Sequence, residues 1–200
     1  MKTQAPNTLS PIFQDWWSSL TDAEHDGRNA DRAGLAQLRR IGRVSAEGSA
    51  EPDLAVALTV NAFRALYKRI GARTDRAEHP DWDLDLVIAA TALAHVREHK
   101  QGQTTASLLW GADLQTPLMA ESRFKRLIRS DSAGDLFDQA RRLVALLKDK
   151  APVGELGASL FLWRTQPKIR RDWARAYYRL DRSGEAATPA NSILPSTGVL

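Results

Sequence analysis

Apolar side chains recur at spacings of three and four residues from about residue 11 to residue 180, and alternation with a period of two never persists. The first spacing gathers side chains on one face of an α-helix, whereas alternation is typical of a half-buried strand. Near the N-terminus, for example, Ile12, Phe13, Trp16, Trp17 and Leu20 share one helical face. The pattern therefore predicts an all-α fold.

Capping and helix-breaking residues divide this pattern into about eight helices. Ser10 and Pro11 are typical of an N-cap and a first helical residue, Asp53 of another N-cap, and Gly71 of a helix end. The expected helices cover residues 11–20, 31–42, 53–71, 82–99, 118–129, 130–150, 155–164 and 167–180, with a short element at 108–114.

The order of these helices predicts two packed lobes. We expect an N-terminal helical lobe over residues 11–115 and a basic C-terminal helical lobe over residues 116–182, after a flexible N-terminus at 1–10. Residues 183–200 are rich in Ser, Gly, Ala, Thr and Pro and carry little charge, so we expect a disordered tail.

Composition narrows the class of protein. The 200 residues include no cysteine, which excludes a disulfide scaffold, a cysteine nucleophile and a thiolate metal site, and which suits a reducing cytosol. No apolar run approaches the roughly 20 residues that a membrane helix needs, and no signal peptide is recognisable. We expect a cytoplasmic protein with no membrane partner and no cofactor.

Charge is distributed unevenly along the chain. The formal net charge is only +4, from 28 Lys+Arg and 24 Asp+Glu. Residues 121–180 hold 14 Lys+Arg against 7 Asp+Glu, a net of +7, and the remaining residues hold 14 against 17, a net of −3. The basic character is therefore regional, and it indicates an anionic partner such as nucleic acid.

Helical geometry gathers these cations into stripes. Lys125, Arg126 and Arg129 share one arc opposite Phe124 and Leu127, with Arg123 at its border. Arg141 and Arg142 extend the series. A second stripe on the last helix consists of Lys168, Arg171, Arg175 and Arg179. Acidic neighbours on the same helices are too few to neutralise these cations, although a solvated surface would explain any one stripe alone.

One string resembles catalytic chemistry. His95-Val96-Arg97-Glu98-His99 has the H-x-x-E-H spacing of inverted zinc peptidases, in which two histidines on one helical face bind the metal. The string lies at a helix end, however, where histidines are favoured by the helix dipole, and Arg97 adds a cation within it. We therefore expect no catalytic residues and no metal site. A helical metallopeptidase stays open as the weakest of three functional hypotheses.

A helix-turn-helix transcription repressor is the second alternative. Such a protein places its basic residues around a short turn and reads bases with the following helix. The net negative charge of the N-terminal part disfavours it.

Several segments together resemble a known family. They are Leu35-Ala36-Gln37-Leu38-Arg39-Arg40, the string from Arg123 to Asp131 that contains LIRSD, and Asp135 with Arg141-Arg142-Leu143. In order and spacing they resemble the small subunit of the type I-E CRISPR Cascade complex, the CasB family, over roughly residues 11–180. A polar loop with Thr104-Thr105 and Trp163 before a basic helix fit the same pattern.

The resemblance implies a non-enzymatic, all-helical subunit of a crRNA-guided surveillance complex in antiviral defence. Its implied partners are crRNA, target and displaced single-stranded DNA, a second copy of itself, and the backbone and large subunits of Cascade. By similarity, Arg40 and Arg129 lead the residues that contact nucleic acid. The full candidate set is Arg39, Arg40, Arg43, Arg123, Lys125, Arg126, Arg129, Arg141, Arg142, Lys168, Arg170, Arg171 and Arg175.

Overall fold

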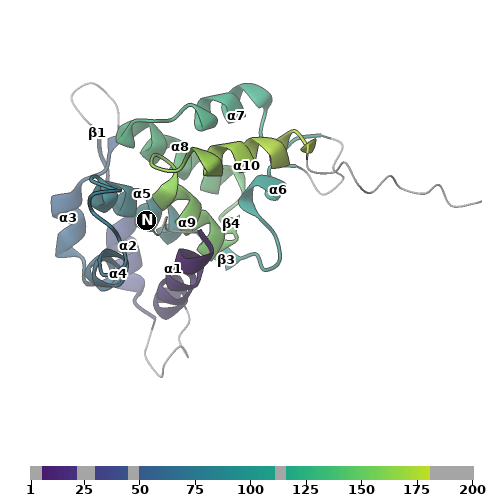
Figure 1. Cartoon of the computed structure of the whole chain (residues 1–200). Coiled ribbons are helices and arrows are strands. Elements are labelled where there is room, and N and C mark those ends of the chain that lie inside the picture. The colour runs from purple at the N-terminus through teal and green to yellow at the C-terminus, as the bar shows by residue number, and fades with distance from the viewer. Residues whose placement is uncertain (1–5, 22–29, 45–49, 111–115, 181–200) are drawn as a thin grey trace, which may run out of the picture.

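The computed structural model describes residues 6–21, 30–44, 50–110 and 116–180, and the expected tail at 183–200 lies outside these ranges. Within them the fold is all-α, as predicted, with two pairs of two-residue strands (Figure 1). The helices are α1 (Pro6–Thr21), α2 (Arg32–Arg39), α3 (Leu54–Thr59), α4 (Asn61–Gly71), α5 (Trp82–Ala94), α6 (Thr105–Leu108), α7 (Glu121–Ile128), α8 (Ala133–Leu146), α9 (Val153–Leu162) and α10 (Pro167–Tyr177).

The strands are short connectors rather than a sheet layer. Strands β1 (Arg43–Val44) and β2 (Ala50–Glu51) pair antiparallel, and β3 (Glu98–His99) pairs in parallel with β4 (Lys150–Ala151). The second pair joins the end of the α5 segment to the segment that follows α8. It therefore links two parts of the chain about fifty residues apart in sequence.

The core lies around α5 and α9. Residues 85–94 of α5 are all buried, and α9 packs against both α5 and α1. Two glycines of α9 permit the close approach of α1. A Cβ at Gly154 would lie 2.5 Å from the Ser10 carbonyl oxygen, and one at Gly157 would lie 2.6 Å from the Phe13 ring. The α1–α9 contact therefore requires glycine at both positions.

Buried residues from both expected lobes belong to one hydrophobic cluster. Phe13 of α1 and Phe161 of α9, for instance, have ring centroids 6.2 Å apart. The division at residues 115 and 116 stays a prediction, and so does the separate N-terminus at 1–10, of which residues 1–5 lie outside the description.

Three predicted helix boundaries were wrong. Helix α1 begins at Pro6, so Pro11 lies inside it rather than at its first residue. The expected helix at 53–71 is interrupted at Val60, whose backbone is extended, and Arg64 donates hydrogen bonds to the exposed Leu58 and Thr59 carbonyls at the end of α3. Helix α5 ends at Ala94, because the backbone N–H groups of Arg97 and Glu98 donate to the Asp149 carbonyl instead.

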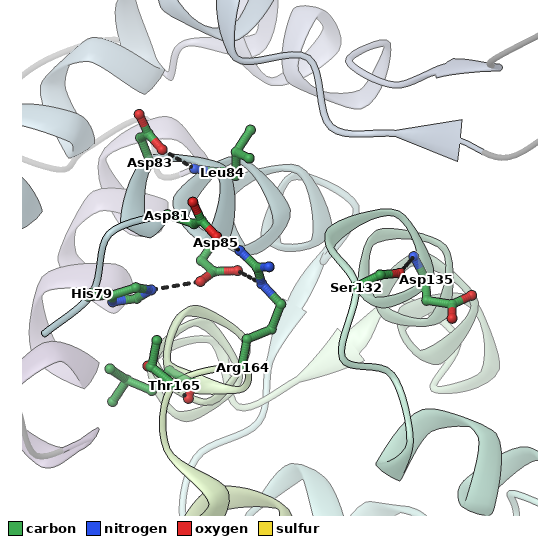
Figure 2. A network of polar contacts seen from close by, with 10 residues as sticks. His79, Asp81, Asp83, Leu84, Asp85, Ser132, Asp135, Arg164 and Thr165 are labelled. Atoms are coloured by element: carbon green, nitrogen blue, oxygen red, sulfur yellow. Dashed lines mark hydrogen bonds and ion pairs between the residues drawn. The ribbon is translucent and has the colours of Figure 1, made fainter.

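The remaining differences concern helix ends. A short helix, α6, occupies residues 105–108, and most of the element expected at 108–114 lies outside the described residues. Helix α8 starts after Ser132, whose hydroxyl accepts from the Asp135 N–H at 3.1 Å (Figure 2). It stops before Lys148 and Asp149, which adopt φ of 54° and 61°. None of the described helices has the length and apolar character needed to cross a membrane.

Candidate nucleic-acid interface

Helix α7 has one buried face and one basic face, as its sequence pattern predicts. Phe124 stacks on Tyr177 of α10, with ring centroids 3.8 Å apart and planes within 8°, and Leu127 is also buried. Tyr177 donates its hydroxyl to the Met119 carbonyl at 2.8 Å, which fixes the start of α7 against α10. The opposite face presents Lys125 and Arg126 to solvent, with Arg129 as the C-cap.

That basic face lines a cleft shared with α8. Helices α7 and α8 lie on the same side of the molecule (Figure 1). A cavity of about 700 Å³ is lined by Ser122, Lys125, Arg126 and Arg129 from the α7 side and by Asp135, Asp138, Gln139 and Arg142 from α8. A second cavity of about 420 Å³ shares Arg126, Gln139 and Arg142 with the first. We call the two together the α7–α8 cleft.

Some cations of the cleft are paired within their own helix, contrary to the expectation of too few acidic neighbours. Lys125 lies 2.8 Å from Glu121, and Arg142 lies 3.3 Å from Asp138. The hydrogen bond between Lys125 and Glu121 raises the pKa of the lysine and lowers the pKa of the glutamate. These pairs are exposed and screened by solvent, so they contribute little to the stability of the fold.

The other three arginines of the α7 segment differ. Within the described ranges, Arg123, Arg126 and Arg129 are exposed and have no ion pair with a carboxylate. Arg126 lines both cavities, Arg129 only the larger one and Arg123 only the smaller one. Positive charge at this cleft therefore exceeds what the surrounding protein neutralises.

Helix α10 carries a partly neutralised stripe. Asp172 pairs with Lys168 and lies 3.8 Å from Arg175, whereas Arg171 is exposed and Arg170 half-buried. The sequence also placed Arg179 on this stripe, and that was wrong. Arg179 follows the helix with φ of 56°, and its guanidinium lies 3.9 Å from the centroid of the Trp110 ring. It serves a cation–π contact at the end of α10.

The arginines at and after the end of α2 have different surroundings. Arg39 is half-buried and donates from Nε to the Ala94 carbonyl at 2.6 Å, where it satisfies a terminal carbonyl of α5. Arg40 is exposed at the C-cap of α2. The backbone of Arg43 belongs to β1, and its side chain lies outside the described part of the chain. Arg39 and Arg40 are adjacent in sequence, but only the Arg40 side chain is exposed.

Arg141 joins this group rather than the cleft. Its guanidinium lies 5.6 Å from the centroid of the Phe137 ring. Burial, and then the charges of Arg141 and Arg39, lower the pKa of His95. The structure therefore brings Arg39 and Arg141 together around His95, while Arg142, the next residue, faces the α7–α8 cleft.

The H-x-x-E-H string does not form the arrangement that a zinc peptidase requires. His95 is the C-cap of α5, and Glu98 and His99 belong to β3, so the two histidines do not share a helical face. His99 accepts from the Val153 N–H at 3.2 Å through Nδ1, and Glu98 pairs with Lys100 and Lys150, which lowers its pKa to about 2. Over the described ranges, no three His, Asp or Glu side chains gather as metal ligands.

A buried charged network, which the sequence did not indicate, joins the start of α5 to Arg164, just after α9. Asp85 is fully buried, accepts from Arg164 Nε at 2.6 Å and lies 2.6 Å from His79 Nε2 (Figure 2). Asp81 lies 3.5 Å from the same guanidinium. In the sequence, Asp81, Asp83 and Asp85 stand in the first turn of a helix, where capping and the helix dipole account for aspartates but not for the burial of Asp85. The signal in the sequence for the burial of Asp85 was the apolar run at residues 86–90 that follows it directly.

Comparison with known proteins identifies the class of this basic helical fold. The family model that matches residues 34–178 describes CRISPR-associated protein Cse2. A similar solved structure is that of a CRISPR-associated protein of the Cse2 family from Thermus thermophilus. The two share 23% identity and a TM-score of 0.55 over 85% of this chain and 97% of the other, a likeness that shows the fold. No curated protein matches the chain.

The match makes the protein a CRISPR-associated one. It belongs to the Cse2 family, the small subunits (CasB) of the type I-E system, and the predicted resemblance is confirmed. Membership implies a subunit of a CRISPR Cascade complex and a part in antiviral defence, in a family of structural subunits rather than known enzymes.

Proposed function

We propose that this protein is a non-catalytic Cascade subunit that holds nucleic acid by its phosphates at the α7–α8 cleft. The observation that carries the proposal is the group of three exposed arginines, Arg123, Arg126 and Arg129, without carboxylate partners in the described residues. Phosphate oxygens fit guanidinium donors in a bidentate way, and binding releases counterions from the nucleic acid.

The proposed role is independent of sequence. The guide RNA supplies specificity by base pairing, and the subunit holds the crRNA–target hybrid or the displaced DNA strand. Arg40, Arg171 and Lys168 offer further phosphate contacts outside the cleft, since all three are exposed. A second copy and the backbone and large subunits of Cascade are the proposed protein partners, in the cytoplasm.

Charge reversal in the cleft tests the proposal. Arg126→Glu with Arg129→Glu should weaken binding of the full-length protein to single-stranded DNA of any sequence. Loss of two phosphate contacts should also lower the slope of log affinity against log salt by about 1.4. Fluorescence anisotropy across a salt series measures both quantities.

A matched control changes the same charge elsewhere. Arg32→Glu with Lys68→Glu alters two exposed cations on α2 and α4, away from the cleft. It should leave the slope nearly unchanged. Equal losses in the two double variants would show that net charge alone governs binding, and the proposal for the cleft would be wrong.

One feature of the structure supports the repressor alternative and another opposes it. Residues 129–132 make a short turn between α7 and α8, as a helix-turn-helix requires. Helix α8, however, presents Asp135 and Asp138 to the cleft, and carboxylates there repel the DNA backbone that a recognition helix must approach. A footprint confined to one duplex sequence would revive that alternative.

A further inference from the structure

The α7–α8 cleft has two chemically different ends. The larger cavity is lined only by polar and charged side chains, among them Arg126 and Arg129. The smaller cavity adds an apolar wall that consists of Met119, Leu143, Ala145 and Leu146. Leu143 and Met119 are buried and anchor the wall in the packed interior, whereas Leu146 is half-buried and Ala145 is exposed. A phosphate binder has no need of an apolar wall beside its arginines.

Gln139 lies where the two ends meet. It is a lining residue of both cavities, and only 9% of its surface is exposed. Among the described residues its amide has no hydrogen-bond partner. A nearly buried amide has two donor hydrogens and an acceptor oxygen, and leaving them unpaired costs free energy unless a ligand or water supplies partners. The Gln139 amide is not among the enclosed polar groups, so it opens on the cleft and is available to a ligand that has both donors and acceptors.

We propose that one unstacked base of a single strand occupies the apolar end of the cleft, an inference that rests on the proposed function. The base lies against Ala145 and Leu146, the accessible part of the apolar wall, the Gln139 amide pairs with its edge, and the adjoining phosphates lie on Arg126 and Arg129. Arg126 and Arg142 line both cavities, so their planar guanidinium groups also offer stacking surfaces.

The arrangement of the two ends favours a nucleotide over a peptide. A nucleotide joins a flat apolar group with hydrogen-bonding edges to an anion at short range, and the cleft joins an apolar wall, an amide and two unpaired arginines in the same order. Bases inside a duplex are stacked and cannot reach such a wall. The cleft should therefore prefer single-stranded to double-stranded nucleic acid.

An abasic strand separates the base contact from the phosphate contacts. The full-length protein is titrated with oligothymidine and with a fully abasic DNA strand of the same length. Seating a base should make the wild-type affinity for oligothymidine at least about fivefold higher. Gln139→Leu and, separately, Leu146→Ser should bring this ratio towards one and leave the abasic affinity unchanged. Arg126→Ala should instead weaken binding of both strands.

The outcomes distinguish the inference from the function beneath it. Equal, salt-dependent binding of the two strands by the wild type would overturn the base site and leave phosphate binding standing, with the apolar end open to a protein segment. A ratio that neither variant changes would place the base elsewhere and overturn the inference too. Absence of salt-dependent binding would contradict the proposed function itself. Leu146 is half-buried, so its variant should fold, and a thermal melt checks this.

Discussion

Two charged regions of the molecule differ in the burial and in the ion pairing of their side chains. Around Asp85 the charges are buried and matched, because the carboxylate meets Arg164 and His79 inside the protein. At the α7–α8 cleft the charges are exposed and only partly matched, because Arg126 and Arg129 have no ion pair with a carboxylate among the described residues. The first arrangement holds helices together, whereas the second leaves binding capacity for an outside anion. The number of charges alone does not distinguish them.

The largest expected effect belongs to the buried region. Asp85→Ala removes the buried partner of the Arg164 guanidinium, which keeps only the exposed Asp81 carboxylate at 3.5 Å. The free energy of unfolding, measured in urea, should fall by about 3–5 kcal/mol. Asp81→Asn is the control, since the Asp81 side chain is 61% exposed and should cost less than about 1 kcal/mol. Equal losses would mean that the two aspartates do not differ in role.

An intermediate effect should separate two adjacent arginines of α2. Arg39→Met removes a charged donor from the Ala94 carbonyl and should lower stability by about 1.5 kcal/mol. Arg40→Met should leave stability unchanged and weaken nucleic-acid binding, because Arg40 is exposed. Denaturation and anisotropy on both variants test the distinction. Equal changes in stability and in binding for the two variants would mean that Arg39 and Arg40 have the same role.

A smaller effect should appear when the cleft loses its own carboxylates. Glu121→Gln with Asp138→Asn frees Lys125 and Arg142, so single-stranded DNA should bind more tightly and with a steeper salt slope. The free energy of unfolding should hardly change, since both ion pairs are exposed. Glu98→Gln, at β3, serves as the control and should not alter binding. A gain with that control as well would indicate a nonspecific charge effect.

The smallest effect concerns pH. Burial, with Arg141 and Arg39, keeps the pKa of His95 below its ordinary value of 6.5, and burial lowers the pKa of His99. The unfolded chain therefore takes up these protons first, and stability present above pH 6.5 is lost as the pH falls through the folded pKa values. Thermal melts between pH 7.5 and 5.5 should show this slope, and His95→Gln should reduce it. An unchanged slope would mean that another group titrates.

Local rules predicted the helix faces well. Phe124 and Leu127 are buried and Lys125, Arg126 and Arg129 exposed, because helical periodicity fixes which side chains share a face. Tertiary contacts decided what the pattern could not. Helix α5 stops at Ala94 because its continuation pairs with the segment after α8, and no property of His95 to His99 shows that partner.

The candidate site was predictable only in its parts. The regional charge and the LIRSD string identified the cations of α7, but the cleft exists because α8 lies opposite them. Gln139 was overlooked since a glutamine in a helix has no distinctive sequence signal, and its place between two cavities depends on the approach of α8. Arg179 was misplaced because the helix ends two residues before it.

The packing of α9 on α1 constrains the order in which the chain can fold. The glycines at positions 154 and 157 contact α1, which begins almost 150 residues earlier, so α1 cannot complete its packing until α9 has been synthesised. During translation the apolar face of α1 has no native partner until α9 has been made. Contacts so distant in sequence slow folding, and the exposed face of the nascent chain is vulnerable to aggregation and to chaperone binding.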